Sequence, residues 1–140
     1  KIREIAKKVI KVDELNFKKN NFYALNLVFV DDKNIKKINK EYRKKNKTTD
    51  VLTFVNSINN NKYVNEIYCD IFFSAETIKK DAKKNLINFY DHITHLMIHC
   101  FLHVNGHDNK NFPVYRDNHH FSNYGAELFI NKLFKQLSLN

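Results

Sequence analysis

The stretch His95-Leu-Met-Ile-His99-Cys-Phe-Leu-His103-Val-Asn-Gly106-His107-Asp108-Asn109 combines an apolar helical pattern with regularly spaced histidines. His99 and His103 are four positions apart, and residues at i and i+4 lie on the same face of a helix. Imidazole rings in such apolar surroundings need polar partners, because a buried polar group without one costs free energy. The stretch therefore predicts a buried helix, residues 90–105, that presents two histidines to one metal ion.

The predicted metal site needs a further ligand, since zinc takes three or four protein ligands. A helix rises about 1.5 Å per residue, so one zinc at His99 and His103 cannot also reach a residue two turns further along. Gly106 predicts the end of the helix, after which the chain can turn back. The candidate third ligands beyond it are His107, Asp108 and Asn109.

The composition is that of one globular domain. The chain has 140 residues, of which 43% are hydrophobic and 14% aromatic, and this excludes a disordered chain. No apolar run approaches the roughly 18 residues of a membrane-spanning helix, and the first residues lack the apolar core of a signal peptide. We therefore expect a cytoplasmic protein, a single domain over 1–140 with no membrane partner, whose Cys69 and Cys100 are reduced and buried.

The formal net charge is +9, almost all of it from lysine. An excess of positive charge fits a polyanionic partner, RNA or DNA. The alternative is a compositional bias, because lysine, asparagine and isoleucine are abundant while glycine and proline number only 2 and 1. AT-rich coding alone produces such a bias, so the charge by itself does not decide between the two.

The remaining hydrophobic pattern predicts an α+β fold. Helices are expected over about residues 2–15, 33–42, 75–85, 90–105 and 123–137, and strands over 24–30, 51–55 and 66–73. Asp31 and Ser74 are suited to cap the second and third helices, and residues 56–62 read as a turn. This order predicts a small mixed β-sheet packed with helices, with the histidine-bearing helix buried at the centre.

Two further segments place polar groups beside expected strands. In the basic loop after residue 42, Arg43 can bind phosphate oxygens through a bidentate fork. Asp50 can cap that loop or orient a histidine, unless the loop is simply solvated and its aspartate structural. Asp70 lies in the apolar segment Cys69–Ser74, so we expect it to be buried and to need a partner, either a metal-binding histidine or backbone amides.

In this order and spacing, the motifs resemble the YbeY family of bacterial endoribonucleases. The matching positions are Asn39, Tyr42, Arg43, Thr49–Phe54, Asp70, Ile71, His95, His99, Leu102, His103, Gly106 and Asp108. The resemblance covers most of the chain, from about Leu25 onward. It implies a zinc-dependent, single-strand endoribonuclease that acts in rRNA maturation at the small-subunit 3′ end and in ribosome quality control. Its implied partners are rRNA, the small ribosomal subunit, and a ribosomal protein or ribosome-assembly GTPase.

The resemblance also implies roles for individual residues. His99 and His103 become zinc ligands, and His99 and Arg43 catalytic residues, with Arg43 near the scissile phosphate. The third ligand of the family falls at Asn109, whose amide oxygen is a poor zinc ligand beside imidazole nitrogen. His107 or Asp108 could take its place, and Asp50 and Asp70 would support the site from outside.

Two alternatives follow from the same residues. A non-catalytic rRNA- or ribosome-binding factor would bind RNA in a strongly salt-dependent way without metal-dependent cleavage. A metal-dependent hydrolase of another substrate would bind zinc without a preference for RNA. A zincin protease is disfavoured, because that class needs glutamate after the first histidine, where this chain has Cys100.

Overall fold

The structure is a computed structural model that describes residues 1–12, 15, 17, 21–60 and 64–104. The chain divides into two compact units. One unit, Lys18–Leu96, contains the β-sheet. The other combines Lys1–Phe17 with the chain from Met97 onward, so the last helix described contributes to both units. The expectation of a single domain over 1–140 therefore stays a prediction.

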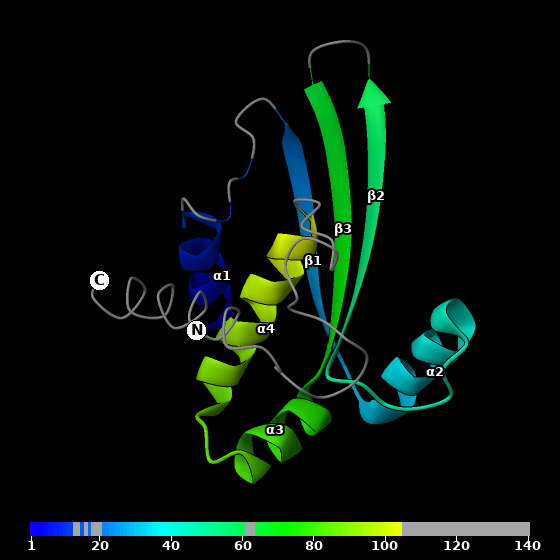
Figure 1. The fold of residues 1–140 in the computed structure, drawn as a ribbon, viewed down its shortest axis with the longest axis vertical. Coiled ribbons are helices and arrows are strands. Elements are labelled where there is room, and N and C mark those ends of the chain that lie inside the picture. The colour runs from blue at the N-terminus through cyan, green and yellow to red at the C-terminus, as the bar shows by residue number, and fades with distance from the viewer. Residues whose placement is uncertain (13–14, 16, 18–20, 61–63, 105–140) are drawn as a thin grey trace. The chain divides into compact units, whose positions relative to one another are not determined.

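The sheet has three strands, β1 (Phe22–Val30), β2 (Val51–Asn60) and β3 (Val64–Ser74). β3 lies between the other two, parallel to β1 and antiparallel to β2 (Figure 1). The predicted mixed sheet is thus confirmed. The expected turn over 56–62 is wrong for residues 56–60, because the β2–β3 register continues to Asn60 opposite Val64, and residues 61–62 lie outside the described ranges. Pairing with β3 outweighs the weak strand preference of asparagine there.

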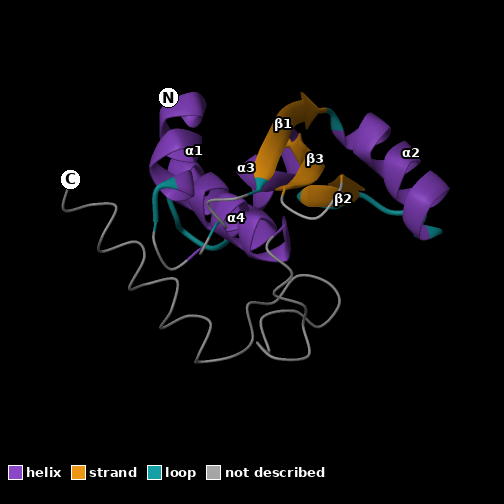
Figure 2. Cartoon of the chain, turned by 90° about the horizontal axis from the view of Figure 1, so that it is seen from above, coloured by secondary structure: helices purple, strands orange, loops and turns teal. Residues whose placement is uncertain are grey.

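The two faces of β3 differ, because successive side chains on a strand point to opposite sides. Cys69, Ile71 and Phe73 are buried at 0–1% exposure. Asp70 and Phe72 alternate with them and line a pocket that also includes residues of α2 (Asp32–Arg43). Figure 2 shows α2 standing to one side of the sheet. The sheet therefore has a closed core face and a more open face toward α2.

The predicted caps fix where two helices begin. The Asp31 carboxylate accepts a hydrogen bond from the Asn34 amide at 2.7 Å, which starts α2. The Ser74 hydroxyl accepts one from the Thr77 amide at 3.3 Å, which starts α3 (Ala75–Lys84). Both side chains satisfy amides that a helix N-terminus leaves without partners. The two capping predictions are confirmed.

The predicted histidine-bearing helix is α4 (Phe89–Val104), and it is buried as expected. Ile93, Leu96, Met97, Ile98 and Phe101 are each at 0% exposure. None of the helices in the described ranges is long and apolar enough to cross a membrane. The expected helix stop at Gly106 and the helix over 123–137 lie outside the described residues.

The first helix, α1 (Ile2–Ile10), ends earlier than the expected residue 15. Its last turn tightens, since the amides of Lys11 and Val12 bond to the carbonyls three residues earlier at 3.2 and 3.1 Å. In the same unit, the ring of Phe17 meets that of Phe101 edge-on at 6.0 Å. The apolar pattern beyond Ile10 thus continues as core packing and not as one continuous helix.

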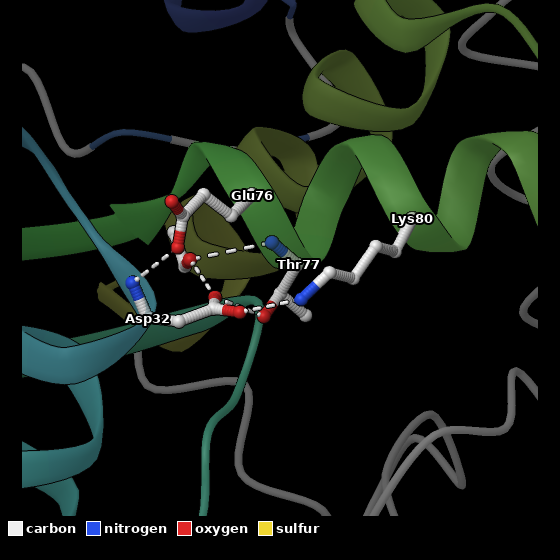
Figure 3. A network of polar contacts seen from close by, with 5 residues as sticks. Asp32, Glu76, Thr77 and Lys80 are labelled. Carbon is white, nitrogen blue, oxygen red and sulfur yellow. Dashed lines mark hydrogen bonds and ion pairs between the residues drawn. The ribbon is translucent and has the colours of Figure 1, made fainter.

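A polar network around Asp32 joins the starts of α2 and α3 (Figure 3). The Asp32 carboxylate accepts hydrogen bonds from Ser74 Oγ at 2.5 Å and Thr77 Oγ1 at 2.6 Å. Lys80 Nζ lies 2.9 Å from its second oxygen, and Glu76 Oε2 accepts from the Asp32 amide at 3.0 Å. Burial alone would raise the pKa of Asp32, but the donors and the Lys80 charge prevail and lower it from 3.8 to about 2.

We expect Asp32→Asn to destabilise the protein in a pH-dependent way. Because the pKa of the folded state lies below that of the unfolded state, the carboxylate stabilises the fold above pH 3.8 and loses this effect as the pH falls toward 2. A shift of this size corresponds to about 2 kcal/mol. Urea unfolding of both proteins should show this difference in the free energy of unfolding at pH 6, and the difference should become smaller below pH 4.

The matched control is Glu4→Gln, which breaks the exposed ion pair with Lys7 on α1. An exposed pair contributes little, so this variant should unfold within about 0.5 kcal/mol of the wild type at either pH. If the free energy of unfolding of Asp32→Asn differs from that of the wild type by the same amount at pH 6 and pH 2.5, the network does not act through the charged carboxylate.

Candidate functional site

The two histidines of the predicted metal site converge on α4. The Nε2 atoms of His99 and His103 are 2.9 Å apart, and the rings meet edge-on at 4.4 Å between centroids. His99 is 5% exposed and His103 half-buried. Zinc–imidazole bonds of about 2.0–2.1 Å place two nitrogens about 3.3 Å apart around a tetrahedral ion. A small opening of the pair would therefore let both rings bind one ion.

The third ligand position lies outside the described residues, because His107, Asp108 and Asn109 all follow Val104. The donors that are described, two imidazole nitrogens, suit zinc and several other first-row metals. This part of the site thus fits a metal ion, and which residue completes it stays a prediction.

His95 lies one turn before His99 on α4 and is half-buried. Burial lowers the pKa of His95 to about 4, with a smaller contribution from repulsion by His92. The ring is therefore neutral at physiological pH. The two cysteines are buried and form no disulfide, as expected, and burial raises the pKa of the Cys69 thiol to about 12. A thiol of this kind is unreactive at neutral pH.

Arg43 is the last residue of α2 and is exposed. The loop that follows is held by Asn39, which is 1% exposed and donates from Nδ2 to the Lys47 carbonyl at 2.8 Å. The Asn39 carbonyl also accepts from the Lys45 amide at 3.2 Å. Lys44 takes a left-handed conformation with φ of 59° at the helix end. Asn39 thus fixes the loop while the guanidinium of Arg43 faces solvent.

Exposed basic side chains lie along α2 and the loop that follows it, and we call them the basic surface. The exposed cations are Lys33, Lys36, Lys37, Lys40, Arg43, Lys44 and Lys47. Arg43 makes no hydrogen bond or ion pair with any residue in the described ranges. Its fork is therefore available to phosphate oxygens, which Arg binds in a bidentate manner.

An aromatic-lined pocket of about 570 Å³ lies beside this basic surface, between α2 and the open face of the sheet. Tyr42 is 64% exposed and packs edge-on against Phe54 at 5.2 Å, which in turn meets Phe72 at 5.9 Å. Exposed aromatic rings beside cations are what proteins use to bind single-stranded nucleic acid, because bases stack on the rings while the cations hold phosphates.

The prediction that Asp70 is buried is wrong. Asp70 is exposed and lines the same pocket, and its partner is the amide of Asn26, which donates to Oδ1 at 2.8 Å. The apolar neighbours Cys69 and Ile71 point into the core, and strand alternation sends Asp70 the other way. The parallel pairing of Asn26 with Asp70 supplies the partner, and nothing in the local sequence indicates that pairing.

Asp50 is half-buried at the start of β2. Its Oδ1 accepts hydrogen bonds from the Val51 amide at 2.8 Å and from Thr49 Oγ1 at 3.2 Å, so it caps the loop. Asp50 is electrostatically coupled to His92 on α4, a residue that the sequence pattern does not mark as functional. Arg43, Asp50 and Asp70 belong to the sheet unit, and His99 and His103 to the other unit.

Comparison with known proteins gives consistent matches. The family described as Endoribonuclease YbeY matches residues 1–115. A protein named Endoribonuclease YbeY from Rhizobium etli is 40% identical over 88 residues, which cover 62% of this chain and 52% of the relative. One from Bartonella quintana is 32% identical over 109 residues, covering 76% and 69% of the two chains. The chain spans about half the length of the Rhizobium relative.

A solved structure shares the fold. The solution structure of TM1509 from Thermotoga maritima aligns with 99% of this chain and 80% of its own, with a TM-score of 0.50 and 21% identity. At that identity the likeness supports the α+β architecture alone, which agrees with the predicted fold class. Since the family match extends over residues 1–115 of 140, this chain belongs to the YbeY family.

Proposed function

We propose that the chain is a zinc-dependent, single-strand endoribonuclease of rRNA maturation, acting in the cytoplasm at the small-subunit 3′ end and in ribosome quality control. The observation that carries this proposal is the convergence of His99 and His103 at 2.9 Å on a buried helix, at the positions where the family resemblance expects metal ligands. Proposed partners are rRNA, the small ribosomal subunit, and a ribosomal protein or ribosome-assembly GTPase.

The metal would be held by His99 and His103 and by one residue among His107, Asp108 and Asn109. When bound, zinc supplies a Lewis acid that polarises a phosphoryl oxygen or lowers the pKa of a water molecule. The neutral state of His95 adds no positive charge to the same helix, which favours a cation nearby.

RNA would be bound by the residues of α2 and the pocket beside it. The lysines of α2 bind phosphates without regard to sequence, and Tyr42 and Phe54 offer faces on which bases stack. The guanidinium of Arg43 would form bidentate hydrogen bonds with the scissile phosphate and stabilise the negative charge that develops on it during cleavage.

A second candidate function is a non-catalytic rRNA- or ribosome-binding factor. It is favoured by one specific residue, Asn109, at the family's third ligand position. This candidate keeps the basic surface around Arg43 and predicts RNA binding that weakens steeply with salt, without metal-dependent cleavage.

Zinc content separates the two candidates. We expect His99→Ala to lower the zinc content of the purified chain by about one ion relative to the wild type, because it removes one of two converging ligands. Elemental analysis of both proteins measures this. Asp91→Asn, which changes an exposed residue on the same helix, is the control and should retain that ion. An unchanged zinc content in His99→Ala would contradict the site.

Asn109→His tests the third position in the same assay. If the wild-type chain already binds zinc through His99, the substitution should leave the ion count unchanged. If instead the wild type lacks this ion and Asn109→His gains one, the wild-type site is incomplete. That result would support the non-catalytic factor and overturn the proposal of a nuclease.

Arg43→Ala should slow cleavage of a single-stranded RNA about 100-fold, since loss of one charge-stabilising donor typically costs 10²–10³ in kcat. Its melting temperature should stay close to that of the wild type, because Arg43 is exposed and forms no hydrogen bond or ion pair within the described ranges. Arg3→Ala, which removes the same charge from an exposed position on α1, is the matched control. If both variants lose activity equally, Arg43 contributes only to the net positive charge of the protein and has no specific role at the scissile phosphate.

A further inference from the structure

Three metal-binding side chains converge in the sheet unit, apart from His99 and His103. They are Asp50 before β2, Asp81 on α3 and His92 on α4, and the nearest ligand atoms all lie within 4.8 Å of one another. All three residues belong to Lys18–Leu96. Three separate parts of the chain thus bring one imidazole and two carboxylates close together.

His92 has no hydrogen-bond partner among the described residues. The residue is 6% exposed, and both Nδ1 and Nε2 are buried without a hydrogen bond to any part of the protein that the structure describes. A buried ring nitrogen without a partner costs free energy, so native structures rarely retain one that nothing else satisfies. The ring lies where a bound cation would satisfy it.

The charges around His92 also favour a cation. Burial lowers the pKa of His92, while Asp50 and Asp81 act in the opposite direction without fully offsetting it. The neutral ring is the form that binds metals. With the ring neutral, the carboxylates of Asp50 and Asp81 face it, and within the described residues neither forms an ion pair with a lysine or arginine. Lys80, the residue before Asp81 on α3, is ion-paired with Asp32 at 2.9 Å and reaches Asp81 only through longer-range electrostatic attraction.

Both carboxylates have oxygens that are available to bind a metal ion. Asp50 uses Oδ1 for the Val51 amide and the Thr49 hydroxyl, and in the described ranges its Oδ2 has no such bond. Asp81 accepts from the Asn85 amide through its backbone carbonyl at 2.9 Å, which leaves its side chain to the cluster. Ligand atoms around zinc lie about 3.3 Å apart, so modest side-chain rotations would close the spacing of up to 4.8 Å.

We propose that Asp50, Asp81 and His92 form a second cation site, which binds a divalent first-row transition ion such as Zn²⁺ or Mn²⁺. The mixed nitrogen and oxygen ligands suit these ions better than Mg²⁺ or Ca²⁺, which prefer oxygen alone. Bound there, the ion ties the start of β2 to α3 and α4 and stabilises the sheet unit. This site goes beyond the proposed nuclease function and does not depend on it.

The first experiment uses the full chain carrying His99→Ala, purified free of metal and titrated with Zn²⁺ by calorimetry. We expect saturable binding that raises the melting temperature, and at least a tenfold loss of affinity when Asp81→Asn is added. Asp91→Asn is the matched control, because Asp91 is exposed on α4 beside His92 and lies outside the cluster. Zinc binding that is unaffected by Asp81→Asn, or equally weakened by Asp91→Asn, would overturn the proposal.

A second measurement needs no substitution. Substoichiometric Mn²⁺ added to the isotope-labelled wild-type chain should broaden the NMR signals of the His92 ring protons, because a paramagnetic ion relaxes the nuclei of its ligands. Ring signals of His92 that stay sharp through the Mn²⁺ titration would overturn the proposal even if a variant failed to fold. Neither outcome changes the zinc count expected at His99.

Discussion

The double pairing of β3 is the constraint on which the rest of the sheet unit depends. With β1 on one side and β2 on the other, the register of β3 fixes its backbone, and alternation then assigns every second side chain to one face. The odd positions Cys69, Ile71 and Phe73 close the core. The even positions open onto the pocket beside α2. Where β3 ends, Ser74 both caps α3 and bonds Asp32, so the same strand also sets where α2 and α3 start.

Burial keeps two histidine rings of α4 neutral. It is the main cause that lowers the pKa values of His92 and His95. A neutral imidazole buried in an apolar helix is both a costly group and a good ligand, and a bound ion removes the cost. On α4, the Nε2 atoms of His99 and His103 lie close together. Earlier on the same helix, the carboxylates of Asp50 and Asp81 face His92.

Local features of the fold could be predicted from the sequence, and features that depend on pairing between distant segments could not. Asp31, Ser74 and the buried α4 follow from caps and helical periodicity, which act within a few residues. The exposure of Asp70 depends on which face of β3 meets α2, and its partner Asn26 on a parallel register across 44 positions. The sequence gives no indication of a role for Asp81, because an aspartate in a lysine-rich helix is typical of a solvated charge, and only the fold brings it close to His92.

The residues that shape the basic surface are separate from those that would hold zinc. Asn39 fixes the loop behind Arg43, the Asp32 network fixes the start of α2, and neither uses His99 or His103. A change at Asn109, the proposed third ligand position, would therefore leave the exposed basic side chains of α2 in place. Loss of the proposed metal site would thus leave the proposed RNA binding intact, because the two properties would rest on different contacts. Cleavage needs both sets of residues, whereas binding needs only the first, and this difference is why zinc content distinguishes the two candidate functions better than RNA affinity does.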